Sequence, residues 1–123
     1  MATKFVLTRD INGYNGFGVV FSDQKYSTTL STGVAQSLTI PSGMGMGANG
    51  IYTKPVYLAV FSFTPGANVF VANNLTAASP GGSFAASNAE LNPAARQVLG
   101  GDVLSFITPD TSAYVTVSLY VIS

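Results

Sequence analysis

Residues 99–122 read LGGDVLSFITPDTSAYVTVSLYVI, and this stretch decides the fold class. Its two apolar runs, Val103–Thr108 and Tyr114–Ile122, are rich in β-branched and aromatic residues, as β-strands are. Between them lies Pro109-Asp-Thr-Ser112, whose residue types favour a tight turn. Gly100-Gly-Asp102 introduces the first run. The stretch therefore predicts two β-strands joined by a turn.

Runs of the same kind lie upstream. Most of them alternate apolar and polar or small residues, the period of a half-buried strand. The run Val56–Phe63 is almost continuously apolar, which indicates a central strand buried on both sides. The other runs expected to be strands are Phe17–Phe21, Val34–Ile40 (with Val34, Leu38 and Ile40 on one parity) and Val69–Ala72.

Turn signals separate these runs. Thr64-Pro-Gly-Ala67 predicts a type II turn, because Pro65 fixes its own φ and Gly66 tolerates the left-handed conformation. Asn-Gly pairs tolerate the positive φ that primed hairpin turns require. These pairs are Asn12-Gly13, Asn15-Gly16 and Asn49-Gly50, and Gly-rich loops are expected at 13–18, 43–50 and 80–83.

Residues 83–97 depart from the strand pattern. They are rich in alanine, and Pro93 limits any helix, so we expect a long loop with one helical turn at most. The chain of 123 residues suits one domain. We therefore predict a single-domain, all-β, antiparallel sandwich or barrel. Residues 1–18 are expected to form an N-terminal arm or hairpin, and residues 19–123 the sandwich.

The chain carries unusually little charge. Charged residues make up 8% of it, with five of each sign, where about 25% is usual for a soluble globular protein. A surface of neutral polar and small apolar groups costs little to desolvate, because no ion loses its water. This composition favours a surface covered by other subunits, and a monomer with a neutral exterior stays open as the alternative.

Catalytic chemistry has few candidates in this sequence. Without His or Cys, neither a Ser-His-Asp triad nor a thiol nucleophile can be built. We expect no enzyme activity, no cofactor and no metal site, and a small hydrolase is the remote alternative. The carboxylates that such a hydrolase would have to use show no close pairing in the sequence: Asp10, Asp23, Glu90, Asp102 and Asp110.

Two motif matches have structural explanations. Residues 45–50 satisfy G-x-G-x-x-G, but Pro55 and a strand-like run follow where a dinucleotide site needs a helix. We expect a loop there. Asn74-Leu-Thr76 matches a glycosylation sequon, and without an export signal in Met1–Asp10 it is interpreted as a chance match.

Nucleic acid and membrane are not expected partners. The five cations are scattered and form no basic patch. The apolar runs are strand-sized, well short of the roughly 20 residues of a spanning helix. The scattered cations are Lys4, Arg9, Lys25, Lys54 and Arg96.

Large aromatic residues in or beside Gly-rich loops have no evident core role. Loop aromatics often supply contact area at interfaces or stack on sugars. The candidate interface residues are Arg9, Tyr14, Phe17, Tyr26, Tyr52 and Phe84, of which Arg9, Tyr14 and Phe17 are expected to contact a larger assembly. Tyr57, Phe61, Tyr114 and Tyr120 lie on strand-like runs and are expected in the core or at a subunit seam.

The Gly-Asp strand opening at 100–102 and the closing strand with spaced aromatics resemble small jelly-roll modules of virion proteins and of complement- and tumour-necrosis-factor-like trimers. Over residues 17–122 the Ala-Ser-Thr-Gly-Asn-rich, Cys-free chain resembles small tailed-bacteriophage virion proteins of the cement or decoration type. The resemblance implies a jelly-roll homotrimer, made in the host cytoplasm, that binds the major capsid protein on the capsid exterior and stabilises the shell. It carries over no site residues. The alternative is a receptor- or glycan-binding knob of a phage fibre or tail.

Overall fold

The computed structural model describes residues 3–42, 45–46, 52–53, 55–81 and 83–122, with the backbone alone at Phe17, 45–46 and 52–53. The described chain is all-β and contains no helix that could cross a membrane. Its strands are β1 (Leu7–Arg9), β2 (Asn15–Val19), β3 (Gln24–Ser31), β4 (Gln36–Thr39), β5 (Gly45–Met46), β6 (Tyr52–Thr53), β7 (Val56–Phe63), β8 (Phe70–Asn73), β9 (Glu90–Leu91), β10 (Ala95–Leu99), β11 (Val103–Ile107) and β12 (Ser112–Val121).

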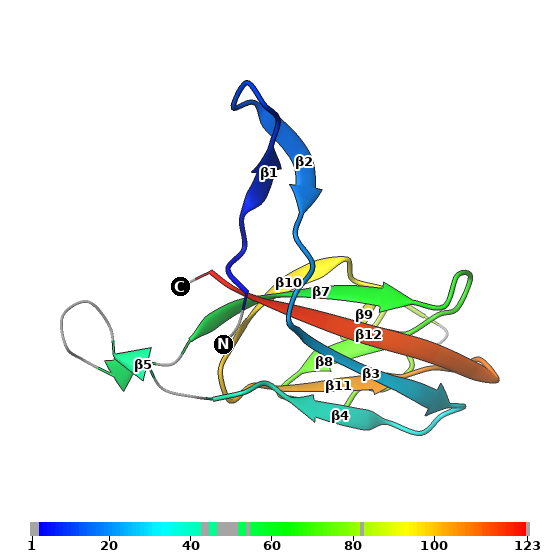
Figure 1. Cartoon of the computed structure of the whole chain (residues 1–123). Coiled ribbons are helices and arrows are strands. Elements are labelled where there is room, and N and C mark those ends of the chain that lie inside the picture. The colour runs from blue at the N-terminus through cyan, green and yellow to red at the C-terminus, as the bar shows by residue number, and fades with distance from the viewer. Residues whose placement is uncertain (1–2, 43–44, 47–51, 54, 82, 123) are drawn as a thin grey trace.

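Two four-stranded antiparallel sheets form a sandwich (Figure 1). Their strand orders are β10-β7-β12-β3 and β4-β11-β8-β9. The eight strands of the sandwich pair in a nested way, the first in the chain with the last and so on inwards. The pairs are β3–β12, β4–β11, β7–β10 and β8–β9. The chain thus runs as one long folded ribbon rolled into a sandwich, which is the jelly-roll arrangement of two Greek keys. The predicted all-β sandwich is confirmed.

The core lies between the two sheets. On β12, Val115, Val117 and Leu119 are buried and alternate with half-buried polar residues, as the period-two pattern predicts. The prediction for β7 is wrong in one respect. Tyr57, Ala59 and Phe61 are buried in the core, but the alternate residues on the outer face are half-buried or, at Ser62, exposed. The apolar run therefore leaves Leu58 and Val60 facing outwards.

The turns agree with expectation at one place and differ at another. Gly66 has φ +80°, and the Ala67 N–H donates to the Thr64 carbonyl at 3.0 Å, which confirms the type II turn. Asn15-Gly16 is no turn but part of β2. The register of β2 against β1 holds this pair in extended backbone. The pair Asn49-Gly50 lies outside the described residues.

The prediction of a long loop over 83–97 is wrong. Among its described residues, β9 and β10 form and no helical turn is present. Asn92 has φ +44°, and its amide group bonds the Val69 N–H and the Ala67 carbonyl, at 2.8 and 2.9 Å. This side chain turns the backbone so that β10 aligns with β7. Pairing with a central strand has overridden the weak β-propensity of the Ala-rich sequence.

The outer faces of the two sheets differ. A second small apolar cluster of Ala72, Ala77 and Ile107 lies outside β8 and β11, with Phe70 and Ala89 packed against it. The segment after β8 forms it by folding over this face, where the Ala77 N–H donates to Ser105 Oγ at 2.9 Å. The outer face of the sheet β4-β11-β8-β9 is thus partly covered by the segment that follows β8.

Candidate interaction surface

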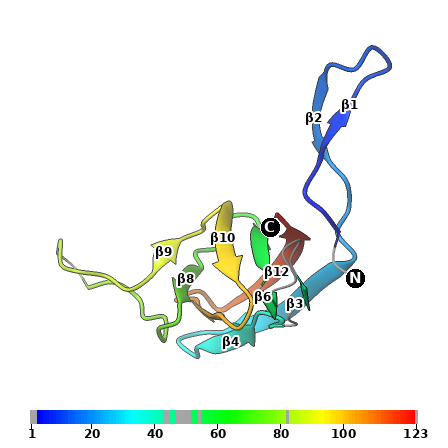
Figure 2. The ribbon, with the colours of Figure 1, turned by 90° about the vertical axis from the view of Figure 1, so that its left-hand side faces the viewer.

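Strands β1 and β2 form a hairpin that projects away from the sandwich (Figures 1 and 2). Its tip is ordered by Asp10, whose Oδ1 accepts the N–H groups of Asn12 and Tyr14 at 2.8 and 2.9 Å. Only Gly13 has a positive φ (+85°) in this turn, so the turn is a type I turn followed by a left-handed glycine and no primed turn. The Arg9 guanidinium donates to the Gly13 carbonyl at 2.9 Å. The conformation of the tip is therefore fixed by hydrogen bonds from Asp10 and Arg9.

One face of the hairpin is nearly free of side chains. Thr8 lies over Gly16 and Gly18, and its Oγ1 accepts the Gly18 N–H at 3.2 Å. A Cβ atom at Gly16 would stand only 2.9 Å from Thr8 Oγ1. The close approach of Thr8 thus favours glycine at both positions.

Polar contacts fix the base of the hairpin on the sandwich. The Thr3 N–H and hydroxyl both donate to Asp23 Oδ1 at 2.9 Å. These bonds, the hydroxyl bond first, lower the pKa of Asp23 below its ordinary 3.8. The Ser22 hydroxyl is buried and donates to the Leu119 carbonyl. On the other strand the Phe5 N–H donates to the Val121 carbonyl at 3.0 Å. Both ends of the hairpin are therefore held by the end of β12.

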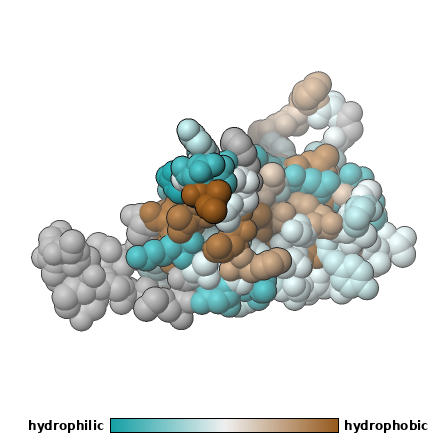
Figure 3. Space-filling model, turned by 45° about the horizontal axis from the view of Figure 1, so that its top comes forward, coloured by the Kyte–Doolittle hydropathy of each residue, from teal (hydrophilic) through white to brown (hydrophobic). Residues whose placement is uncertain are grey.

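The hairpin exposes large apolar side chains. Ile11 at its tip is 99% exposed, Tyr14 72% and Phe21 at its base 92%. In Figure 3, where the hairpin comes towards the viewer, brown hydrophobic residues lie beside teal polar ones. Contiguous exposed apolar surface commonly marks a protein interaction site. Further exposed apolar residues of this segment are Val6, Leu7, Val19 and Val20.

The carboxylates serve local structure. Asp10 orders the hairpin tip and Asp23 its base. Asp110 accepts the Asn68 N–H at 2.8 Å, and Asp102 accepts the Leu99 N–H at 2.9 Å. Glu90 pairs with Arg96 at 3.0 Å, and the bond from Arg96 lowers the pKa of Glu90. The described carboxylates come from different turns and strands, and no group of three gathers as metal ligands among the described residues.

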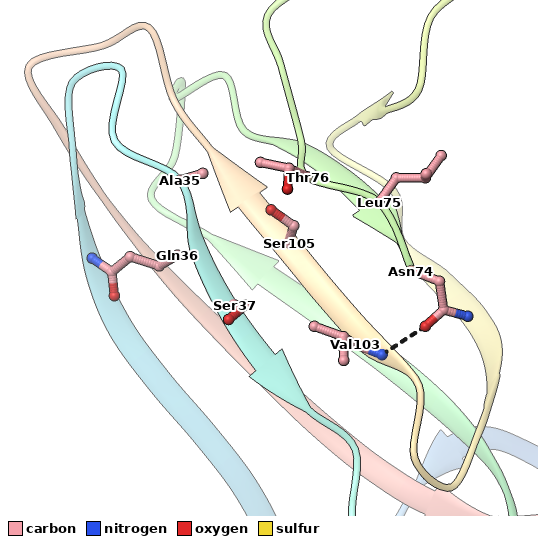
Figure 4. A pocket seen from close by; sticks show the side chains of 8 residues that line it. All are labelled: Ala35, Gln36, Ser37, Asn74, Leu75, Thr76, Val103 and Ser105. Carbon is pink, nitrogen blue, oxygen red and sulfur yellow. Dashed lines mark hydrogen bonds between the residues drawn. The ribbon is translucent and has the colours of Figure 1, made fainter.

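A shallow hollow of about 390 Å³ lies on the outer face of β4 and β11 (Figure 4). The Ser105 hydroxyl at the floor of this hollow accepts a hydrogen bond from the Ala77 N–H. Asn74 Oδ1 accepts the Val103 N–H at 2.9 Å, the dashed line in Figure 4. The lining is neutral and includes no aromatic ring: Ala35, Gln36, Ser37, Asn74, Leu75, Thr76, Val103 and Ser105. These groups hold the segment after β8 in place and offer no acid, base or stacking platform.

The two long sides of the sandwich are closed differently. Between β9 and β10 the Glu90–Arg96 ion pair joins the edges. Between β3 and β4 a slot of about 390 Å³ remains, and the core residues Phe106, Val115 and Val117 line it. The β3–β4 side is thus the more open of the two.

The candidate interface residues are separated by the fold. Arg9 lies in β1 and Tyr14 at the hairpin tip, and the backbone of Phe17 is in β2. The prediction that Tyr26 lies in or beside a loop is wrong, because pairing with β12 places it within β3. Tyr52 is in β6, and its side chain is outside the described structure. Phe84 is exposed on the distant segment before β9.

The strand-borne aromatics also divide. Tyr57, Phe61 and Tyr120 are buried, whereas Tyr114 is exposed on the outer face of β12. Ile11 and Phe21 are the most exposed apolar residues of the hairpin, and neither was predicted as an interface residue. Their signal was an apolar residue directly beside the Asn12-Gly13 turn and a second one just before the polar start of β3.

Comparisons of the chain with protein-family models, with curated proteins and with solved structures find no match. The fold assignment rests on the strand order of the chain itself. The function of the protein is inferred from the surface of the protein.

Proposed function

We propose that this protein is a non-enzymatic structural subunit that joins a larger protein assembly through its projecting hairpin. The observation that carries the proposal is a hairpin held at its base by Thr3–Asp23 and Tyr120–Val20 contacts while Ile11, Tyr14 and Phe21 face solvent. An isolated two-stranded hairpin is marginally stable in water. A partner that covers these side chains would stabilise it by removing apolar area from water.

The low charge supports the same proposal. The chain has no net charge, so copies packed on a lattice do not repel one another strongly. A neutral contact surface depends little on salt, because it contains few ion pairs to screen. Modest single contacts become strong when many copies bind at once.

The specific assembly that we propose is a virus capsid. The jelly-roll strand order and the neutral surface accord with a capsid cement or decoration protein, bound to the outside of the head shell as a homotrimer and in contact with the major capsid protein. The hairpin would lie in a groove of the shell and brace neighbouring shell subunits.

The experiment is mass spectrometry of particles purified from the virus that encodes the sequence. The protein should be present in a fixed ratio to the shell subunits, whose number is set by the symmetry of the shell. Particles lacking it should break at a lower temperature. Particles of unchanged stability would contradict the proposal.

A receptor- or glycan-binding knob of a fibre or tail is the second candidate. The exposed rings of Tyr14 and Phe84 favour it, because sugars stack on aromatic rings. These rings lie on different elements, and the hollow in Figure 4 contains no aromatic side chain. Binding on a glycan array that is lost on replacing Tyr14 would favour this function over the first.

A further inference from the structure

The outer edge of β3 carries backbone groups that its own sheet does not use. The Thr64 N–H donates to the Tyr114 carbonyl at 3.1 Å, so the backbone of Tyr114 faces β7. Thr29 lies opposite Tyr114 in the β3–β12 ladder, and its backbone groups therefore point away from β12. The Gln36 side chain confirms this direction, because its Nε2 donates to the Thr29 carbonyl at 2.9 Å from outside the sheet.

The same alternation places Lys25 and Ser27 on this free edge, since backbone groups in an antiparallel strand alternate in direction. The backbone N–H and C=O groups of Lys25 and Ser27 therefore point away from β12, next to the slot between β3 and β4. Figure 2 shows β3 at the margin of the sandwich, on the side where the hairpin rises. Such an unpaired edge is a template for another strand. The edge of β3 contains no proline, and Lys25 is its only charge.

The open part of the edge has two defined ends. At one end Asp23 bonds Thr3, and the chain turns into the base of the hairpin. At the other end Gln36 bridges to Thr29 and accepts the Thr28 hydroxyl at 3.0 Å, so β4 covers the edge there. The open window is therefore Gln24–Thr28, and Tyr26 is its central residue.

We propose that this window pairs with the same window of a second copy, antiparallel and about a twofold axis at Tyr26. In this register Lys25 of one copy faces Ser27 of the other, and both pairs of outward N–H and C=O groups find partners. The two free edges would join their sheets into one continuous eight-stranded sheet, given the order β10-β7-β12-β3 in each copy. Such a contact is isologous, because the same surface serves on both sides.

The charge pattern favours a second copy of the chain as the occupant. A twofold axis at Tyr26 puts the charged Lys25 opposite a neutral serine, so that no like charges meet across the strands, which would be destabilising. Lys25 is also held over the exposed Phe21 ring, 5.9 Å from its centroid. The slot beneath the window is lined by the buried core residues Phe106, Val115 and Val117 and by the half-buried Leu38. Pairing would bring two such slots side by side.

This inference rests on the proposed assembly role and adds to it. A twofold β3–β3 contact would link neighbouring trimers into a continuous layer over a shell. The pairing and the shell binding are nevertheless separate properties, because the hairpin that we propose for shell contact is not part of the window.

The test is a disulfide across the axis. The backbone of Tyr26 points towards β12, so the two Tyr26 residues would form a non-hydrogen-bonded pair with Cα atoms about 4.5 Å apart, a separation that permits a disulfide. The chain has no cysteine of its own. The full-length Tyr26→Cys protein, concentrated and mildly oxidised, should therefore give a covalent dimer on non-reducing electrophoresis.

The matched control is Ser27→Cys, one residue along the same strand. In the proposed register the two Ser27 Cα atoms are offset by two residues and lie roughly 8 Å apart, beyond easy disulfide reach. It should give several-fold less dimer than Tyr26→Cys. Adding Ser27→Pro to Tyr26→Cys should abolish the dimer, because proline removes an outward N–H that no strand of its own sheet uses.

Equal dimer yields from Tyr26→Cys and Ser27→Cys, or none from either, would overturn the pairing. So would a covalent dimer that persists with Ser27→Pro while circular dichroism shows an intact fold. A chain that binds particles but forms no Tyr26→Cys dimer would refute the twofold contact alone. A dimer formed by a protein that is absent from particles would refute the capsid role and leave the contact standing.

Discussion

The hydroxyl of Tyr120 donates a hydrogen bond of 2.6 Å to the carbonyl of Val20, while its ring stands edge-on to Phe5 at 5.8 Å. Val20 and Phe5 flank the two strands of the hairpin, so one residue of β12 contacts both sides of its base. The direction of the hairpin is thereby tied to the end of β12, an inner strand of its sheet. A flexible tail would need no such contact.

Replacing Tyr120 by phenylalanine should loosen the hairpin and leave the sandwich folded. The ring and its contact with Phe5 remain, but the bond to Val20 is lost, at a cost of about 0.5–1.5 kcal/mol. Hydrogen exchange should become faster over residues 5–22 and stay unchanged in β7 and β11. Unchanged exchange in the hairpin would show that the hydroxyl does not hold it.

Acid should release the base of the hairpin. The folded-state pKa of Asp23 is lowered by its bonds from Thr3. The stabilisation is therefore present above the ordinary value of 3.8 and is lost as the pH falls through the lower folded-state pKa. Amide signals of Thr3 and Asp23 in NMR spectra should shift together in that range. Asp23→Asn, which keeps an acceptor oxygen but cannot ionise, should lack this step.

Gly16→Ala should distort the hairpin. The new Cβ would stand 2.9 Å from Thr8 Oγ1 and 3.3 Å from the Thr8 carbonyl oxygen. We expect weaker order in β1 and β2 by hydrogen exchange, with the unfolding temperature of the sandwich nearly unchanged. Adding Thr8→Ala removes the nearer atom and should restore part of the order. If order does not recover, the contact of the new Cβ with the Thr8 carbonyl oxygen, and not with the hydroxyl, causes the distortion.

Phe61→Ala should destabilise the core by about 3–5 kcal/mol, the usual cost of truncating a buried ring. Phe61 is 7% exposed and packs against Phe63 and Phe106, with ring centroids 6.2 Å away in each case. Phe84→Ala removes an equal ring from an exposed position and should change the free energy of unfolding by less than about 0.5 kcal/mol. Denaturant unfolding of the two variants compares them directly, and similar losses would place Phe61 outside the core.

The fold was predictable where local signals and packing agree. Alternating residues in β12 and the Pro65-Gly66 turn are specified within a few neighbouring positions. β10 was not predictable, because its strand conformation comes from pairing with β7 and from the Asn92 turn, which joins residues distant in sequence. Tyr26 shows the same limit. Its neighbours in the sequence are polar, and only the ladder with β12 shows that it lies within an edge strand.

The candidate surface was predictable in part. A Gly/Asn-rich amino-terminal segment indicated an arm, and Tyr14 lies on it as expected. Phe21 and Ile11 were not singled out, because an apolar residue next to a turn is as often buried as exposed. Only the projection of the hairpin away from the sandwich leaves both of them in solvent.

The most direct test of the assembly role measures the binding of the purified protein to particles stripped of it. The variant Ile11→Ser, Tyr14→Ser and Phe21→Ser changes only exposed hairpin residues and should fold normally. If the hairpin is the contact, this variant should bind at least about tenfold more weakly, since loss of interface anchors costs more than about 1.4 kcal/mol. The control Phe84→Ser should bind like the unchanged chain. Equal binding by the hairpin variant and the unchanged chain would contradict the account.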